Sequence, residues 1–344
     1  MRVGVIGDGG WGTALALVLC RNGHAVRLWG AFPEVLAETR RARENCKFLP
    51  GVSLPADLEL TADPAECSAG AELLFSAVPT PYLRSVTDRF RAHLSRDVPL
   101  VSATKGLEEG TLARPTEILE GSLGPGRRLV ALSGPSHAEE VGRGLPTTVV
   151  AAGREAADAC LVQRALGNER FRVYTSEDSI GVELGGALKN VVALAAGICD
   201  GLAIGDNAKA ALLTRGMVEM ARYGATRGAR RETFSGLSGM GDLIVTCYSR
   251  HSRNRAVGER LARGETLEAI LASTPMVPEG VFTTRALGRG RTPVEMPVTR
   301  QVYAVLFEGK DPRRAVTDLM TRDPRAERDA EESAGSPCGG PAAG

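Results

Sequence analysis

Short apolar runs alternate with helix-like stretches over the first half of the chain. The runs are rich in valine, leucine and isoleucine, and the segments between them have helical spacing. This alternation predicts a mostly parallel sheet with helices on both faces, which is the doubly wound α/β class. The expected strands are Val3–Ile6, Ala25–Trp29, Leu73–Val78, Leu100–Ala103, Leu129–Ser133, Thr147–Ala151 and Phe171–Tyr174.

After Thr175 only helical spacing remains, which predicts an all-α second domain. We expect domains at 1–175 and 176–322, and Ser176 as the N-cap of the first long helix. From about residue 323 mixed charges lead into a Gly-, Ser- and Pro-rich end, so 323–344 is expected to be a disordered tail. The expected helices are Ile180–Cys199, Ala208–Ala225, Asn254–Ala262, Leu267–Ala272 and Arg300–Phe307.

A single lysine stands in the most apolar of these helices. Lys189 lies among valine, leucine, alanine and glycine residues of 181–197, so we expect it to be enclosed. Burial disfavours the charged form and lowers the pKa of a lysine towards the range useful for proton transfer. Lys189 is therefore the leading candidate for a catalytic acid/base.

Composition narrows the possible functions. A chain of 344 residues fits two domains, and a formal net charge of +1 gives no field that would gather nucleic acid or lipid headgroups. Seven cysteines without a Cys-x-x-Cys pair, not clustered with the four histidines, argue against disulfides and a metal site. The chain begins directly with a strand, and we expect no run long enough to cross a bilayer. These features favour a cytoplasmic protein that binds neither nucleic acid nor membrane.

Residues 7–12 read G-D-G-G-W-G, which matches the pattern G-x-G-x-x-G between a strand and a helix. In that context the glycines permit a tight turn, close approach of the backbone to a pyrophosphate, and close packing of helix on strand. The motif predicts a site for a nicotinamide dinucleotide, either NAD(H) or NADP(H).

Two features leave the choice between these cofactors open. The second strand ends at Gly30-Ala31 without an acid that would hold the adenosine ribose, and without an arginine that would hold a 2′-phosphate. Asp8 places a carboxylate inside the phosphate-binding loop. Because it would repel the pyrophosphate from there, we expect its side chain to point outward.

Distinctive residues follow three further strands, where ligands of open α/β sheets bind, and residues 78–81 close the first of these strands with a rigid turn. Lys105 follows the strand at 100–103 and is either aimed at a ligand or a solvated loop lysine. Residues 133–140 read S-G-P-S-H-A-E-E, in which Ser136 and the backbone around Gly134 suit substrate oxygens. We assign no direct chemistry to His137.

The second domain contributes a segment that is glycine-rich, then apolar, then basic, at 236–255. Asp242 could orient either the Lys189 ammonium group or a hydroxyl group of the substrate. The other interpretation is that it is a simple helix N-cap. Arg253 is either a bidentate phosphate ligand or part of a solvated helix start.

Six motifs in this order resemble the bacterial-type NAD(P)-dependent glycerol-3-phosphate dehydrogenases, from Arg2 to about Pro324. The resemblance implies an N-terminal Rossmann-type sheet with an all-α C-terminal substrate domain, in a homodimer. It also implies reversible hydride transfer between NAD(P)H and C2 of dihydroxyacetone phosphate, which supplies sn-glycerol 3-phosphate for phospholipid synthesis. The motifs are Gly7–Leu15, Ala77–Thr80, Lys105–Gly106, Gly134–Glu140, Leu188–Val191 and Ser252–Arg255.

The resemblance also implies a role for individual residues. Lys189 would be the general acid/base, and the other catalytic residues would be Lys105, Asp242 and Asn190. The cofactor contacts would be Gly7, Gly9, Gly10, Trp11, Gly12, Ala31, Lys105, Ala138, Arg253, Val277 and Glu279. The substrate contacts would be Lys105, Gly134, Ser136, Lys189, Asp242, Ser252, Arg253 and Asn254.

The chain departs from the family pattern at three places. Asp8 and Gly10 stand where the family commonly has alanine and serine, and Ala31 stands where many members have a basic residue. Glycines replace a helical stretch around Gly288, so we expect a helix to be broken there.

Two alternative functions stay open. A β-hydroxyacid or 6-phosphogluconate-type dehydrogenase would share the two-domain architecture and the helix-borne lysine, although residues 252–255 favour glycerol phosphate. A catalytically silent dinucleotide-binding sensor would have no reason to keep Lys105, Lys189, Asp242 and Arg253 together.

Overall fold

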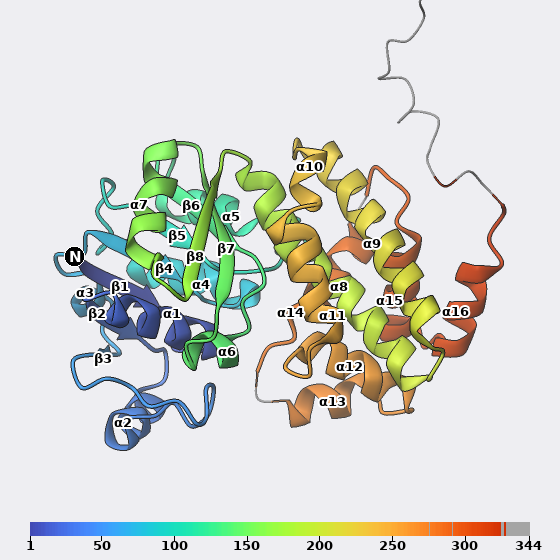
Figure 1. The fold of residues 1–344 in the computed structure, drawn as a ribbon, viewed down its shortest axis with the longest axis horizontal. Helices are drawn as coiled ribbons and strands as arrows, with labels where there is room; N and C mark the ends of the chain where they lie inside the picture. The colour runs from blue at the N-terminus through green and yellow to red at the C-terminus, as the bar shows by residue number, and fades with distance from the viewer. Residues whose placement is uncertain (275, 291, 325–326, 328–344) are drawn as a thin grey trace, which may run out of the picture.

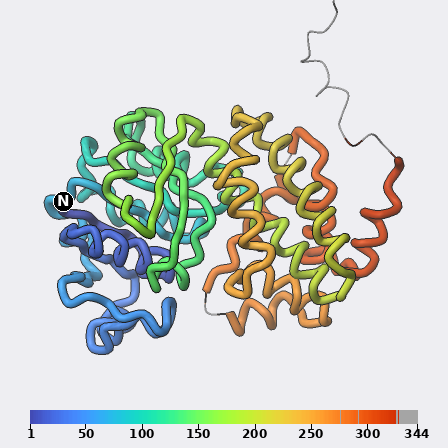
Figure 2. Tube along the Cα trace, in the orientation of Figure 1, coloured from blue at the N-terminus to red at the C-terminus, as the bar shows by residue number. Residues whose placement is uncertain are grey.

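The computed structural model describes residues 1–274, 276–290, 292–324 and 327. Figure 1 shows an α/β part beside an all-helical part, with α8 in the middle of the helical part. The colours of Figure 2 follow the chain from the first part, blue to green, into the second, yellow-green to red. The predicted fold class, a Rossmann-type α/β domain followed by helices, is confirmed.

The α/β part is built on a single sheet in the order β3-β2-β1-β4-β5-β6-β7-β8. All neighbouring strands are parallel except β6 and β7. The seven expected strands are present, and the short edge strand β3 was not predicted. The strands are β1 (Arg2–Ile6), β2 (Ala25–Trp29), β3 (Glu59–Thr61), β4 (Leu73–Ser76), β5 (Leu100–Ser102), β6 (Leu129–Ser133), β7 (Thr147–Gly153) and β8 (Phe171–Ser176).

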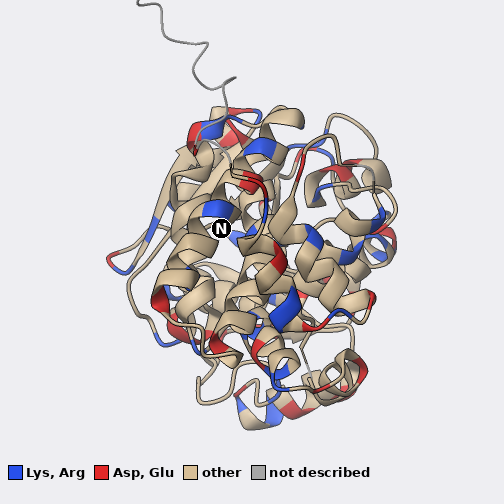
Figure 3. Ribbon diagram, turned by 90° about the vertical axis from the view of Figure 1, so that its right-hand side faces the viewer, with Lys and Arg blue, Asp and Glu red and all other residues tan. Residues whose placement is uncertain are grey.

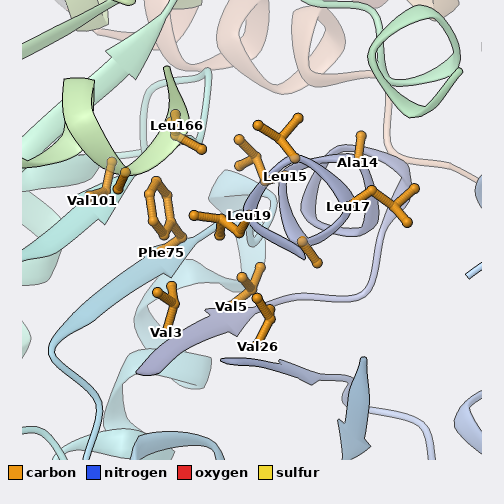
Figure 4. Packing of buried hydrophobic residues seen from close by; sticks show 14 of the residues in the cluster. Val3, Val5, Ala14, Leu15, Leu17, Leu19, Val26, Phe75, Val101 and Leu166 are labelled. Atoms are coloured by element: carbon orange, nitrogen blue, oxygen red, sulfur yellow. The ribbon is translucent and has the colours of Figure 1, made fainter. Parts of the chain in front are cut away.

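Helices pack on this sheet through apolar faces. In Figure 4 Leu15 and Leu19 of the first helix lie over Val5 of β1, Phe75 of β4 and their neighbours, and all of these side chains are buried. This packing fixes the start of the first helix at the end of β1. The helices of this part are α1 (Gly10–Arg21), α2 (Pro33–Ala42), α3 (Pro64–Ser68), α4 (Thr80–Phe90), α5 (Pro115–Leu123), α6 (Ala138–Gly142) and α7 (Ala156–Leu166).

No strand follows Ser176 in the part of the chain that the structure describes. The helices are α8 (Ser179–Gly201), α9 (Asp206–Thr226), α10 (Arg231–Phe234), the π-helix η1 (Leu237–Gly241), α11 (Asp242–Tyr248), α12 (Arg253–Ala262), α13 (Leu267–Ser273), α14 (Glu279–Arg289), α15 (Pro297–Phe307) and α16 (Pro312–Met320). A domain boundary near residue 175 stays a prediction. Most of the expected tail, 323–344, lies outside the described residues. Lys and Arg are interspersed with Asp and Glu in Figure 3.

Helix α8 is the centre of the helical part, since α9, α11, α12 and α14 all pack against it. It is the one helix among the described residues long and apolar enough to cross a membrane, so the expectation that no such run exists is wrong. The helix is apolar on every side because other elements enclose it on every side. Asp178, not Ser176, caps it: the Asp178 carboxylate accepts from the Gly181 N–H at 2.9 Å.

Two glycines let α8 and α12 cross almost backbone to backbone. A Cβ on Gly197 would lie 1.9 Å from the Arg255 carbonyl oxygen, and a Cβ on Gly258 would lie 2.0 Å from that of Leu194. This close approach places the start of α12 beside the middle of α8.

Helix α14 does not break at Gly288 itself, but it ends at the next residue, Arg289, within the stretch between Ala286 and Pro293 where a break was expected. A Cβ on Gly288 would lie 2.0 Å from the Tyr303 ring, so the missing side chain makes room for α15 and does not interrupt the helix.

We predict that Gly197→Ala destabilises the fold by about 1–3 kcal/mol, because its methyl group would overlap the α12 backbone. Chemical denaturation measures this free energy of unfolding. The matched control is Gly121→Ala in α5, where a Cβ would lie 3.7 Å from its nearest neighbour, an Arg84 nitrogen. The control should be neutral or gain up to about 1 kcal/mol of helix propensity. Equal effects of the two substitutions would contradict the close crossing.

Candidate active site

A cleft of about 180 Å³ lies between the carboxyl ends of the strands and the helices α8, α11, α12 and α14. Most of the predicted site residues line it: Gly9, Gly10, Trp11, Lys105, Ser136, Ala138, Lys189, Asn190, Ser252, Arg253, Asn254, Val277 and Glu279. Five others do not form its wall: Gly7, Gly12, Ala31, Gly134 and Asp242. The two parts of the fold therefore bring residues of both domains to one place.

Two lysines share one buried carboxylate beside this cleft. Lys189 Nζ lies 2.5 Å from Asp242 Oδ1, and Lys105 Nζ lies 2.7 Å from Asp242 Oδ2. Asp242 is 1% exposed. Burial alone would raise the pKa of Asp242, but the two ammonium groups outweigh it and hold the pKa below its ordinary value. Asp242 therefore remains ionised beneath the floor of the cleft.

Lys189 is buried as the sequence predicts, with 5% of its surface exposed. Burial lowers the pKa of Lys189 to about 8, with a further lowering from Lys105 and a partial compensation by Asp242. Its Nζ donates to Asp242 and, at 2.8 Å, to Thr246 Oγ1. An ammonium group has three N–H donors, so one is left for a ligand in the cleft.

The Lys105 ammonium group is hydrogen-bonded within the protein and is not a solvated loop lysine. Its Nζ donates to the Gly134 carbonyl oxygen at 2.9 Å, to Ser136 Oγ at 3.2 Å and to Asp242. All three of its N–H donors are thus engaged. Gly134 and Ser136 act on the site through Lys105 in this arrangement.

Helix α11 explains how Asp242 reaches both lysines. Asp242 is the first residue of α11, directly after the π-helical turn η1, and its side chain makes no capping hydrogen bond. The alternative of a simple N-cap is therefore wrong. Thr246, one turn later on the same face, donates to the Asp242 carbonyl oxygen at 2.6 Å. Sequence reasoning gave Thr246 no role, although its spacing from Asp242 was the available signal.

Two asparagines tie the helices of the site together. Asn190 Nδ2 donates to the carbonyl oxygens of Lys105 and Gly186, each at 3.3 Å, and Asn190 Oδ1 accepts from Asn254 Nδ2 at 3.0 Å. Asn254 Oδ1 in turn accepts from the Gly280 N–H at 2.9 Å. This chain joins α8, α12 and α14 to the loop after β5. Both amides therefore position backbone around the cleft.

The start of α12 presents a cation at the mouth of the cleft. Ser252 caps the helix by accepting from the Arg255 N–H at 3.2 Å. Arg253 follows, with an exposed side chain that donates to the Val277 carbonyl oxygen at 3.1 Å. The remaining N–H donors of Arg253 suit an anionic ligand.

The glycine loop has the shape that a dinucleotide needs. Gly7 has φ +110°, and a Cβ on Gly12 would lie 1.8 Å from the Gly7 carbonyl oxygen, so both glycines are required by the turn. A Cβ on Gly9 would meet nothing within 4 Å, which leaves the loop open on its cleft side. Beyond the loop, the first turn of α1 offers free N–H groups to an anion.

Trp11 Nε1 and Glu279 Oε2 are among the buried polar atoms that lack a hydrogen bond. Both residues line the cleft. The other Glu279 oxygen accepts from the Thr80 N–H at 2.9 Å, which bridges the two parts of the fold. An open glycine loop with unsatisfied donors and acceptors beside it fits a dinucleotide. Ala31, an expected cofactor contact, does not line the cleft. It packs against the hydrophobic cluster that contains Ile6 and Trp29.

The expectation for Asp8 is wrong. Its side chain does not point outward: Asp8 is 8% exposed and its carboxylate lies against Gly30 at the end of β2. The absence of a side chain at Gly30 makes this space.

His137 lines the cleft with its ring centroid 6.1 Å from that of His251. Burial and the neighbouring Lys189 lower the pKa of His137, and its Nε2 atom has no partner. Neither histidine makes a hydrogen bond to Lys189 or Asp242 among the described residues.

The sequence matches known proteins over most of its length. The family described as NAD-dependent glycerol-3-phosphate dehydrogenase matches over 2–159 for its N-terminal part and over 178–317 for its C-terminal part. Over 96% of its length, this chain is 47% identical to the whole of a glycerol-3-phosphate dehydrogenase [NAD(P)+] of Chlorobium luteolum. It is 49% identical to the Pelotomaculum thermopropionicum enzyme of the same name, covering 93% of each chain.

A crystal structure of glycerol-3-phosphate dehydrogenase from Coxiella burnetii is similar throughout. Its TM-score is 0.89 at 37% identity, and the match covers 93% of this chain and 99% of the other. Sequence and fold thus agree, and the chain belongs to the family of NAD-dependent glycerol-3-phosphate dehydrogenases.

Proposed function

We propose that the protein interconverts dihydroxyacetone phosphate and sn-glycerol 3-phosphate with NAD(H) or NADP(H), and that Lys189 carries the proton. The observation that carries the assignment of Lys189 is its spare N–H donor. Lys105 has all three donors engaged, whereas Lys189 keeps one free in the wall of the cleft. Of the two lysines, Lys189 is therefore the one placed to donate to a substrate.

Reduction of a ketone requires a hydride at carbon and a proton at oxygen. When bound, the reduced nicotinamide ring supplies the hydride to C2. The Lys189 N–H bond breaks as the new O–H bond forms, which leaves a neutral amine. Oxidation runs these changes in reverse, and the amine then takes the hydroxyl proton. With a pKa near 8, Lys189 exchanges a proton close to neutral pH at low cost.

The second lysine and the carboxylate keep this proton transfer possible. Once Lys189 is neutral, Asp242 still pairs with Lys105 at 2.7 Å, so no isolated charge is left in the interior. Before transfer, the nearby positive charge of Lys105 stabilises negative charge that develops on the substrate oxygen.

The substrate phosphate is assigned to the start of α12. Arg253 is held by Val277 with donors to spare, and Asn254 adjoins it in the cleft wall. Bidentate contact by a guanidinium favours a phosphate over an uncharged group. This arrangement favours a phosphorylated substrate over a β-hydroxyacid.

The cellular role is proposed on the family resemblance. The protein would work in the cytoplasm as a homodimer and supply sn-glycerol 3-phosphate for phospholipid synthesis. Its substrates would be small molecules, with no nucleic acid or membrane as a partner.

The direct test is oxidation of NADH, and separately of NADPH, when dihydroxyacetone phosphate is added. We expect loss of absorbance with this substrate and little with unphosphorylated dihydroxyacetone or a β-keto acid, since only the phosphate engages Arg253. Absence of oxidation by a protein that binds the cofactor would refute the proposed function. Faster oxidation with the β-keto acid would replace it by the hydroxyacid function.

We predict that Lys189→Met lowers kcat by about 10²–10⁴-fold, because the proton donor is lost. NADH binding, followed by fluorescence, should change little. The fold should survive because Asp242 keeps Lys105 as its partner. The control Lys310→Met alters a lysine between α15 and α16, outside the residues that line the cleft. A Lys189→Met protein with the turnover of this control would remove Lys189 from the mechanism.

The pH profile gives a separate prediction. Reduction needs the ammonium form of Lys189, so kcat/KM for dihydroxyacetone phosphate should be level below about pH 8 and fall about tenfold per unit above it. Oxidation of glycerol 3-phosphate needs the neutral amine and should fall below about pH 8. Steady-state rates in both directions measure these limbs. If kcat/KM for reduction and for oxidation changed in the same direction with pH, the assignment of Lys189 would be contradicted.

A further inference from the structure

The carboxylate of Asp8 occupies an unusual place at the adenosine end of the cofactor-binding loop. A Cβ built on Gly30 would lie 2.4 Å from Asp8 Oδ2, so the carboxylate rests on the Gly30 backbone at the tip of β2. Asp8 is 8% exposed, and Oδ2 is buried without a hydrogen-bond partner. A buried acceptor without a donor is costly unless a ligand supplies one.

The backbone holds Asp8 in this position. Its carbonyl oxygen accepts from Asn45 Nδ2 at 2.7 Å and from Thr13 Oγ1 at 3.2 Å. Thr13 belongs to α1 and Asn45 to the loop after α2, and Asn45 Nδ2 also donates to Thr13 Oγ1 at 2.9 Å, so two linked elements hold this carbonyl group. The backbone of Asp8 is therefore fixed, and its carboxylate is buried against Gly30 at the tip of β2.

In dinucleotide-binding sheets an acid at the end of the second strand accepts a hydrogen bond from the adenosine ribose 2′-hydroxyl. Here β2 ends at Trp29 and is followed by Gly30 and Ala31, with no acid. The next acid along the chain is Glu34, which is exposed in the first turn of α2. The carboxylate that lies at the tip of β2 comes instead from the glycine loop.

We propose that Asp8 takes the place of the missing β2 acid, accepts the ribose 2′-hydroxyl of NAD(H), and repels the 2′-phosphate of NADP(H). This inference rests on the proposed function only in requiring a nicotinamide dinucleotide as the ligand. It makes the protein selective for NAD(H), through a residue outside the usual position.

The charge of Asp8 supports the selection. Burial raises the pKa of Asp8 to about 6, with a partial lowering by its backbone hydrogen bond and by Lys47. At pH 8 the side chain is therefore ionised. A carboxylate next to a phosphate in a partly dry site disfavours binding, whereas a hydroxyl gains a charge-assisted hydrogen bond.

Three basic residues nearby, Arg40, Arg43 and Lys47, make contacts elsewhere. Lys47 Nζ lies over the rings of Phe32 and Phe48, 5.8 and 5.1 Å from their centroids. Arg40 donates to the Leu60 carbonyl oxygen and Arg43 to that of Pro55. Of these three, Lys47 is the residue that could oppose the effect of Asp8, since rotation of its side chain would present an ammonium group to the 2′-phosphate of NADP(H).

The test is direct binding of NADH and NADPH, without substrate, followed by the fluorescence of the reduced nicotinamide at pH 8. We expect the unaltered protein to bind NADH at least about tenfold more tightly than NADPH. Asp8→Asn should weaken NADH binding and strengthen NADPH binding, so that the ratio of the two Kd values shifts by about tenfold or more. Asp8→Ala should shift it in the same direction.

Two controls complete the design. Glu34→Gln removes one negative charge from the same end of β2 and should leave the ratio within about twofold, because Glu34 is solvated. Lys47→Met should also leave the ratio unchanged. Thermal unfolding of each variant shows whether the loop remains folded, and Asp8→Ala replaces Asp8→Asn if the latter does not fold.

Several results would overturn the inference. These are equal affinity of the unaltered protein for both cofactors, an unchanged ratio in the Asp8 variants, a parallel loss of both cofactors, or a shift caused by Glu34→Gln or Lys47→Met. Failure of the proposed function is a different result, namely absence of turnover with dihydroxyacetone phosphate while the binding ratio still responds to Asp8.

Discussion

The site depends on one ionised carboxylate that is buried between two ammonium groups. Asp242 alone would be expensive to bury, and so would either lysine, but together they satisfy one another. The group carries one more positive than negative charge while both lysines are protonated. Burial, more than this excess, lowers the pKa of Lys189 and makes it ready to lose its proton, with a smaller lowering by Lys105. The pairing of these three side chains therefore both allows their burial in the folded protein and sets up the proposed proton transfer.

The helical part is arranged so that this ion cluster keeps its shape. Helix α8 carries Lys189 and Asn190, and glycines on α8 and α12 remove any side chain between the two backbones. The Asn190–Asn254 hydrogen bond then fixes the rotation of one helix against the other and continues to Gly280 on α14. A shift of any one helix would move Lys189 relative to Asp242. The apolar character of α8, which gives it the composition of a membrane-spanning helix, follows from its enclosure by other elements on every side.

Much of this was predictable from the sequence, for reasons that can be stated residue by residue. Strands and helices follow from apolar periodicity, and the three-residue strand β3 was missed because so short a run has no period. Lys189 is predictable because a lysine in an otherwise apolar helix has no ordinary structural role that would explain it. Asp242 and Lys105 each have such a structural role available, as a helix cap and as a solvated loop lysine. Only the short distances from Asp242 to the two lysines exclude these roles. Gly288 looked like a helix breaker because propensity ignores the ring of Tyr303 that occupies the space beside it.

Asp8 shows why a local argument fails where two distant segments meet. Considered within its own loop, the carboxylate faces only a pyrophosphate, and repulsion predicts that it turns outward. The space that it occupies is made by Gly30, which belongs to another strand and whose missing Cβ is not visible from the loop sequence. The two departures from the usual pattern, an acid in the glycine loop and no acid at the end of β2, therefore meet at one place, because the Asp8 carboxylate lies against Gly30.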